Sequence, residues 1–197
     1  PAGGPLLEEA SLQVHSAILD HGIPCLGFSL KERYHINIIS QELQAMGLAT
    51  GRWLQAFKRA LYAKAPSDRL IEAPCSDRPG RTRTFPLGAL AARIAAITPG
   101  QKIAYVADVA FHEANARRIR ALARDADHLF VEGAFLDEDR AIAQQKKHLT
   151  AGQAGELAAQ AGVKRVTVFH FSPRYERRIQ RLQEQAQRAF RETRARR

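Results

Sequence analysis

The 197-residue sequence predicts an α/β protein in which strands and helices are layered. Short apolar runs alternate with helical patterns between residues 102 and 169, as is typical of this class. A hydrophobic fraction of 45% with 25% charged residues is ordinary for a globular chain with a core. No apolar run approaches the roughly 20 residues that cross a bilayer, so we expect no membrane partner.

The first half of the chain contains two strands and two helices by its apolar spacing. An imperfect alternation over 11–19 and an apolar run over 25–30 predict a strand pair that turns at Asp20-His21-Gly22. Apolar residues at helical spacing predict helices over 36–46 and 53–62. Proline, glycine, aspartate and arginine are concentrated in 66–84, which we interpret as a basic loop.

The second half repeats strand and helix patterns and ends in a basic helix. The expected helices cover 87–97, 112–124, 136–146, 151–161 and 176–197. The expected strands cover 102–107, 129–131 and 163–169. Eight arginines in the last helix could attract phosphate, although such a run is also typical of a solvated helix face.

The net charge indicates a class of binding partner, and the cysteine content indicates the redox environment. The excess of 30 Lys+Arg over 20 Asp+Glu gives a formal charge of +10, which favours polyanions such as nucleic acid. Cys25 and Cys75 are too few for a disulfide framework and form no paired CxxC motif. We therefore expect a reducing, cytoplasmic environment.

Three polar residues stand where strands end. His21 follows the first strand, Asp108 follows the strand over 102–107, and His170 follows the strand over 163–169. Ligand groups of layered α/β folds gather at such ends, and two imidazoles with a carboxylate suit zinc. Each residue taken alone could instead cap a strand or satisfy a loop.

A second pair of residues could move a proton. Glu132 ends the strand over 129–131, and His148 precedes Thr150, which is a plausible N-cap for the next helix. A carboxylate that contacts an imidazole holds it in one tautomer, as a proton donor requires. The alternative is a surface histidine and an unrelated strand-end acid.

Basic and aromatic residues are mixed around residue 53. Arg52 and Lys58 accompany Trp53 and Phe57, a combination that suits contacts to an RNA backbone and stacking on its bases. The packing of an amphipathic helix explains the same pattern equally well.

Five segments in order resemble the second half of the ribonuclease Z enzymes, which are tRNA 3′-processing endonucleases. They are Leu19–Phe28, Tyr105–Asp108, Val131–Phe135, His148–Ala151 and His170–Tyr175. The resemblance implies a metallo-β-lactamase-like four-layer αβ/βα sandwich, and residues 1–197 would form mainly its second half. A segment resembling the family's flexible arm, which grips tRNA, would cover 31–65.

The resemblance also assigns roles to the residues above. His21 would ligate one zinc ion, Asp108 would bridge two zinc ions, and His170 would ligate the other; manganese is an alternative metal. His148 would assist the leaving oxygen, with Glu132 as its orienting partner. Arg174, Arg52 and Lys58 would contact precursor tRNA, and the enzyme would be a homodimer.

Two features limit these expectations. The family's first-half signature HxHxDH is absent, and the sequence starts with Pro-Ala-Gly-Gly-Pro, so we expect a longer protein and an inactive chain on its own. Ala107 and Val109 replace the usual Gly and Thr around the bridging aspartate. The alternatives are a metallo-β-lactamase-fold hydrolase of another substrate, such as a small phosphodiester or a thioester, and a non-catalytic basic binding module.

Overall fold

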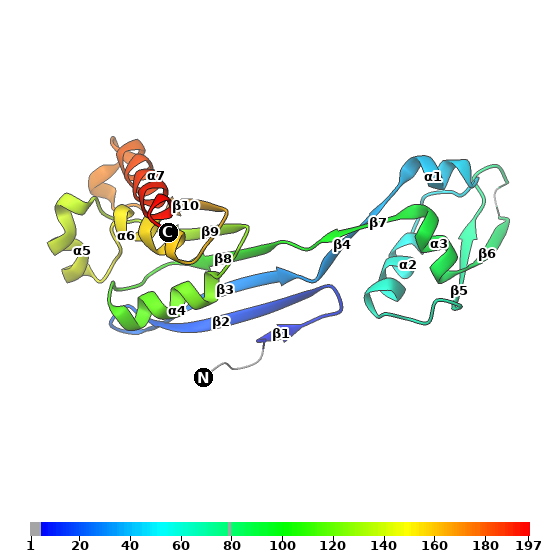
Figure 1. The fold of residues 1–197 in the computed structure, drawn as a ribbon, viewed down its shortest axis with the longest axis horizontal. Coiled ribbons are helices and arrows are strands. Elements are labelled where there is room, and N and C mark those ends of the chain that lie inside the picture. Colours follow the sequence, from blue (N-terminus) through cyan, green and yellow to red (C-terminus); the bar gives the residue numbers. More distant parts are fainter. Residues whose placement is uncertain (1–4, 79) are drawn as a thin grey trace. The chain divides into compact units, whose positions relative to one another are not determined.

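The computed structural model describes residues 5–78 and 80–197, which form two compact units (Figure 1). Unit 1 comprises the segment ending at Glu8, Gln13–Lys31 and Gln101–Arg197. Unit 2 comprises Glu9–Leu12 and Glu32–Gly100. Most of unit 2 is therefore an insertion between two strands of the unit 1 sheet.

Unit 1 contains a six-stranded sheet with the order β1-β2-β3-β8-β9-β10. Its strands are β1 Leu7–Glu8, β2 Leu12–Asp20, β3 Pro24–Glu32, β8 Lys102–Val106, β9 His128–Glu132 and β10 Arg165–Phe169. The pairs β1–β2 and β3–β8 are antiparallel, whereas β8, β9 and β10 are parallel. The carboxyl ends of these three parallel strands consequently meet at one edge of the sheet.

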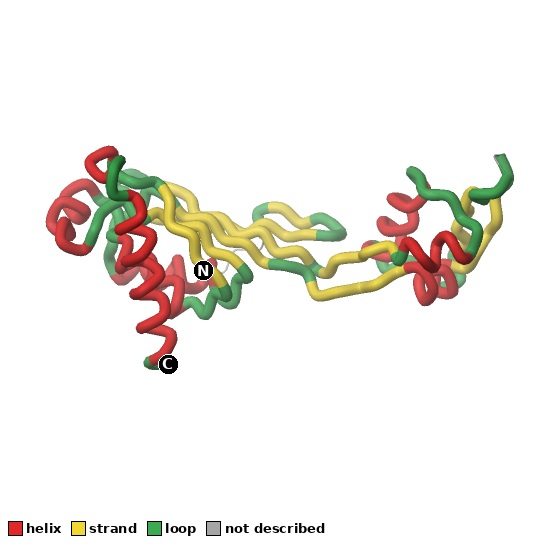
Figure 2. Tube along the Cα trace, turned by 90° about the horizontal axis from the view of Figure 1, so that it is seen from above, coloured by secondary structure: helices red, strands yellow, loops and turns green. Residues whose placement is uncertain are grey.

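Three of the described helices pack on one face of this sheet, namely α4 Glu113–Ala123 against β8, α6 Ala151–Gln160 against β9 and β10, and α7 Ile179–Ala195 against β10 (Figure 2). The helix α5 Arg140–Lys146 contacts the 3-10 turn η1 Asp137–Asp139, and a second 3-10 turn, η2 Pro173–Tyr175, precedes α7. Alternate strand residues such as Val106 and Val131 join Ile119 and Leu157 in the buried core. Among the described helices, none is long and apolar enough to cross a membrane.

The other face of the sheet carries exposed apolar side chains. Phe28 pairs with Tyr105, and Leu30 pairs with Ile103, across β3 and β8. All four side chains are at least 36% exposed, although large apolar residues usually lie inside a fold. These two exposed apolar pairs lie on the face of the sheet opposite the helices.

The helices α6 and α7 pack so closely that a side chain does not fit between them at Gly155. A Cβ atom at this position would lie 2.2 Å from the backbone oxygen of Ala186. We expect Gly155→Ala to lower the free energy of unfolding by about 2 kcal/mol, because α7 must shift. Urea denaturation would measure this change against Glu156→Ala, an exposed neighbour in α6; equal stabilities would contradict the packing.

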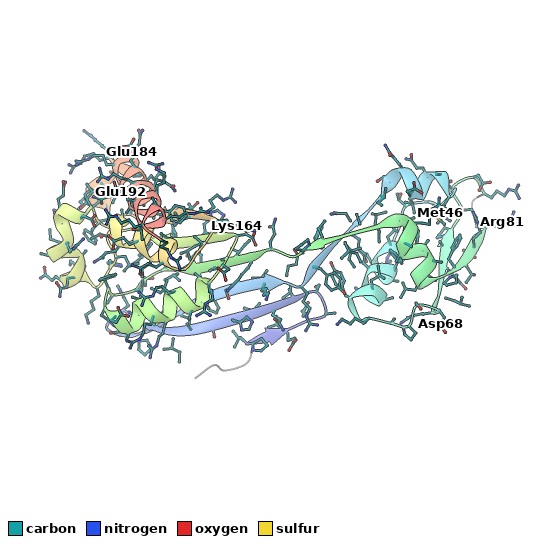
Figure 3. All side chains as sticks on the ribbon, in the orientation of Figure 1. Met46, Asp68, Arg81, Lys164, Glu184 and Glu192 are labelled. Atoms are coloured by element: carbon teal, nitrogen blue, oxygen red, sulfur yellow. The ribbon has the colours of Figure 1, made fainter. Side chains whose placement is uncertain are left out.

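Unit 2 has its own small core. Its elements are β4 Tyr34–Ile38, α1 Ser40–Ala45, α2 Trp53–Tyr62, β5 Leu70–Pro74, β6 Thr82–Pro86, α3 Leu87–Ile94 and β7 Ala95–Pro99. The strands form two antiparallel pairs, β4–β7 and β5–β6. Phe57 and Leu90 are fully buried between the helices, and Met46, labelled in Figure 3, packs against the same cluster.

Three secondary-structure predictions in this unit were wrong. The helix expected over 36–46 begins only at Ser40, since Ile36 lies in β4 opposite Ile97 of β7. The helix expected over 87–97 therefore ends at Ile94. Within the expected loop 66–84, of which residue 79 lies outside the described residues, β5 and β6 form a strand pair. Local apolar spacing could not reveal partners so distant in the chain.

Candidate metal centre

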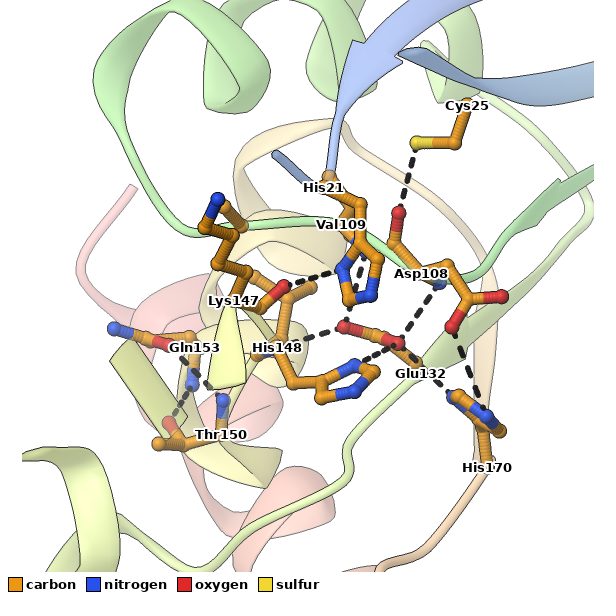
Figure 4. Close-up of polar contacts among 12 residues, drawn as sticks. His21, Cys25, Asp108, Val109, Glu132, Lys147, His148, Thr150, Gln153 and His170 are labelled. Carbon is orange, nitrogen blue, oxygen red and sulfur yellow. Dashed lines mark hydrogen bonds and ion pairs between the residues drawn. The ribbon is translucent and has the colours of Figure 1, made fainter. Parts of the chain in front are cut away.

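The ends of the three parallel strands bring four potential ligand residues together (Figure 4). Asp108 follows β8, Glu132 ends β9, and His170 follows β10. With His148, which lies between α5 and α6, each offers one ligand atom, and these atoms all lie within 4.8 Å of one another. The parallel topology is what places residues from distant segments at this edge.

The backbone is strained where it presents these side chains. Asp108 and His170 have φ angles of 51° and 60°, and Lys147, next to His148, has a φ of 61°. This left-handed conformation is uncommon for residues other than glycine and costs on the order of 1 kcal/mol each. Three strained residues at one site indicate that the backbone conformation is retained because it positions these side chains, although it lowers stability.

The carboxylate of Glu132 is the centre of the site and is fully buried. Its Oε1 accepts hydrogen bonds from the backbone N–H groups of Leu149 at 2.9 Å and Val109 at 3.4 Å. Its Oε2 accepts one from the backbone N–H of Asp108 at 2.9 Å. Both oxygens are thus engaged by the backbone, so Glu132 organises the site and is a poor candidate for a metal ligand.

Glu132 also orients both imidazoles. Its Oε2 lies 3.0 Å from Nδ1 of His148 and 3.1 Å from Nδ1 of His170. A carboxylate that accepts from Nδ1 leaves Nε2 of each ring for a ligand or substrate. The contact expected between Glu132 and His148 is present, and the second contact, to His170, was not foreseen.

These contacts shift the pKa values of the pair. Burial raises the pKa of the Glu132 carboxyl, but hydrogen bonds from His148 and the Leu149 backbone outweigh burial and lower it below its ordinary value. The hydrogen bond with Glu132 raises the pKa of His148 against the opposing effect of burial. Glu132 therefore stays ionised, and His148 is a better proton carrier near neutral pH than a free histidine.

The donor set fits a divalent cation. His170 Nε2 lies 3.8 Å from Asp108 Oδ1. Two ligands that each lie about 2 Å from a shared zinc ion are separated by somewhat more than 3 Å, so only a small adjustment is needed. Imidazole and carboxylate are both ligands that zinc accepts.

His21 lies beside this group. Its Nδ1 is 2.8 Å from the backbone oxygen of Lys147, and its ring centroid is 4.6 Å from that of His148. An imidazole that donates through Nδ1 to a carbonyl is the arrangement usual for a metal-binding histidine. The structure thus brings His21 to the same edge as Asp108 and His170, although its ligand atoms are outside the tight group of four.

Two supporting residues were missed in the sequence. Asn115 is buried, and its side chain donates to the backbone oxygens of Asp20 and Ala110 and accepts from the Asp20 N–H. Cys25 Sγ donates to the backbone oxygen of Asp108 at 2.8 Å, and burial raises the pKa of this thiol. Asn115 sits on the apolar face of its helix, which was the only signal in the sequence.

The expected substrate-binding residues are distributed over both units. Arg174 lies in η2, pairs with Asp139 at 3.6 Å, and is 44% exposed. A neighbouring cavity of about 250 Å³ is lined by Lys146, Phe171 and both site histidines, His148 and His170. Arg52 and Lys58 belong to unit 2.

Comparisons with known proteins identify the family of the chain. The family model described as Beta-lactamase superfamily domain matches residues 63–171, which is over half of the chain. The chain is 30% identical to Ribonuclease Z of Deinococcus radiodurans over 176 residues, which cover 89% of this chain and 49% of that protein. It is 34% identical to Ribonuclease Z of Thermobifida fusca over 172 residues, which cover 86% of this chain and 46% of that protein.

A solved structure supports the fold. The metallo-beta-lactamase fold protein YhfI from Bacillus subtilis matches with a TM-score of 0.51 and 12% identity, covering 95% of this chain and 46% of that one. The chain spans about half the length of the curated relatives it matches. It therefore belongs to the beta-lactamase superfamily and has a ribonuclease Z-like metallo-β-lactamase fold of the α/β class.

Proposed function

We propose that the intact protein is a metal-dependent phosphodiester hydrolase that cleaves RNA, with precursor tRNA as its substrate. The observation that carries this proposal is the convergence of Asp108, His148 and His170 around the buried Glu132. The relatives named Ribonuclease Z support the choice of a hydrolase and of RNA.

In the proposed site, His21, Asp108 and His170 hold two zinc ions, with manganese as an alternative. Bound divalent ions supply a nucleophile from water near neutral pH and offset the charge on phosphoryl oxygens. The chain's own contribution is to keep these side chains in place. Glu132 orients His170 through Nδ1, and the Cys25 thiol and the Glu132 carboxylate fix the backbone on either side of Asp108.

His148 is proposed as the residue that gives a proton to the leaving oxygen. Glu132 holds its Nδ1, so its Nε2 is available for substrate. The hydrogen bond with Glu132 is the main cause of the raised pKa of His148. Because of this raised pKa, the ring stays protonated up to a higher pH than a free histidine. This proton would stabilise the alkoxide that departs from phosphorus.

A further part of the intact protein is proposed to complete the site. Three protein ligands from this chain are too few for two ions, and the chain covers about half of its relatives. The apolar sheet face around Phe28 and Tyr105 is suited to packing against a second sheet. We therefore infer that the chain alone is inactive.

The partners are proposed from charge and site chemistry. A formal charge of +10 favours an RNA backbone, which Arg174, Arg52 and Lys58 would contact. Phe171 and Lys146 beside the site histidines combine an aromatic ring with a cation, as suits a nucleotide. A cytoplasmic homodimer is the proposed form.

The test of this proposal is the variant His148→Ala in the intact protein. Bound metal should be retained, whereas kcat for a model phosphodiester should fall by about 10²- to 10⁴-fold, the usual effect of losing a general acid. Metal analysis and steady-state kinetics would measure both, with His35→Ala of unit 2 as the control. Cleavage at the parental rate would refute the role of His148.

Departures from the family's motifs favour a second candidate. Ala107 and Val109 flank Asp108 in place of the usual Gly and Thr, and such departures weaken the assignment of the substrate more than that of the fold. A hydrolase of another substrate, either a small phosphodiester or a thioester, is therefore the runner-up. The proposed function requires precursor tRNA to be cut in preference to a chromogenic phosphodiester, whereas the reverse preference would favour the runner-up.

A further inference from the structure

An arginine-lined surface lies at the opposite edge of the unit 1 sheet from the metal centre. A cavity of about 570 Å³ is lined by four arginines, namely Arg117, Arg120, Arg124 and Arg197. An adjoining cavity of about 510 Å³ shares Arg120 and Arg197 and adds Arg196. Among the described residues that line the two cavities, Asp125 has the one acidic side chain.

The topology separates this surface from the metal centre. Asp125 precedes β9 and Gly162 precedes β10, whereas Glu132 and His170 stand at the other ends of these strands. Lys164, labelled in Figure 3, marks the edge because it directly precedes β10. Strands of five residues span roughly 17 Å, so one small ligand cannot occupy both places.

Two of the guanidinium groups are held in position. Arg120 donates through Nη1 to Gln160 Oε1 at 3.0 Å and through Nη2 to Glu113 Oε1 at 2.8 Å. Arg197 donates through Nη1 to the backbone oxygen of Ala159 at 2.7 Å. Their remaining donors are therefore preorganised, which reduces the entropy lost when a ligand binds.

The negative partial charges of the nearby helix ends do not neutralise all of the positive charge of these arginines. The helices α4, α6 and α7 end near these cavities, and each helix end carries a partial charge of about −0.5. Glu113 and Asp125 add two negative charges against five arginines. In the part of the chain that the structure describes, no acidic side chain lies within ion-pair distance of Arg124 or Arg196. A positive surplus therefore faces solvent.

We propose that the two cavities bind consecutive phosphates of the RNA backbone, at a distance from the scissile bond. The assignment of RNA rests on the proposed function. A planar guanidinium group can donate two parallel hydrogen bonds to the oxygens of one phosphate. Two adjoining cavities along one edge suit a ligand that carries phosphates at regular intervals, as RNA does. The arginine site would strengthen the binding only of RNAs long enough to extend from the metal centre to the two cavities.

The test compares two double variants of the intact protein that lose the same charge. R117Q/R124Q removes two cavity arginines, whereas R188Q/R191Q removes two exposed arginines of α7 that line neither cavity. Only the first should raise the Kd for precursor tRNA, by about tenfold, and reduce the slope of log K against log salt by about 1 to 2. Cleavage of a dinucleoside phosphate should stay at the parental rate in both.

Three results would contradict either the proposed RNA site or the proposed hydrolase function. Equal Kd values for the two double variants would overturn the RNA site. Tight binding of inorganic tripolyphosphate that R117Q/R124Q alone abolishes, with unchanged tRNA binding, would reassign the cavities to a free oligophosphate and so also overturn it. A parent protein that cleaves neither RNA substrate would contradict the hydrolase function, while the comparison of Kd values would still decide the RNA site.

Discussion

Glu132→Gln is expected to lower the free energy of unfolding by roughly 2–4 kcal/mol and to weaken metal binding. The two carboxylate oxygens accept three backbone N–H groups, from Asp108, Val109 and Leu149. A glutamine amide must turn its NH₂ group toward at least one of these backbone N–H groups. Because a backbone N–H can only donate, that N–H loses its acceptor. A buried donor left without an acceptor costs about 1–3 kcal/mol, and the lost charge also weakens the bonds from both imidazoles.

Urea denaturation of the intact protein would measure this loss, and equilibrium dialysis would measure zinc affinity. Glu156→Gln is the matched control, because this exposed glutamate of α6 undergoes the same chemical change away from the site. If Glu132→Gln left both stability and zinc affinity at the control level, Glu132 would not be the centre of the site.

Asp108→Asn should abolish binding of at least one metal ion and lower kcat by at least about 10²-fold, with little change in stability. Its carboxylate is 53% exposed, so the fold does not depend on its charge. Asparagine tolerates the φ of 51° at this position better than alanine does, so the backbone should be preserved. The variant therefore isolates the ligand from the strained turn that presents it.

Asp125→Asn provides the control for this variant. Asp125 has a similar φ of 54° and undergoes the same loss of charge, but it lies at the opposite edge of the sheet. Metal content and cleavage of a chromogenic phosphodiester should match the parent in this control. Full metal occupancy in Asp108→Asn would remove Asp108 from the ligand set.

The ends of the parallel strands could be predicted from the sequence because the signals there are local. Apolar runs locate β8 and β10, and a polar residue directly after each run gives Asp108 and His170. The helix over Trp53–Tyr62 was likewise predicted with its observed bounds, since its amphipathic spacing is contained in ten residues. Local patterns suffice where the element itself carries the information.

Contacts made through the backbone could not be predicted in this way. The sequence suggested that Glu132 orients His148, but not that it also contacts His170 and three backbone N–H groups. Those contacts depend on left-handed turns at Asp108 and His170, which these residue types tolerate but do not by themselves predict. The pairing of β4 with β7 was missed for a related reason, because its partners lie about 60 residues apart.

We expect this edge of the sheet to hold divalent cations in the intact protein. The metal content per chain, measured after equilibration with zinc and removal of free metal, tests this expectation. We expect about two tightly bound ions per chain and fewer in Asp108→Asn. An intact, folded protein that retains no zinc or manganese would contradict it.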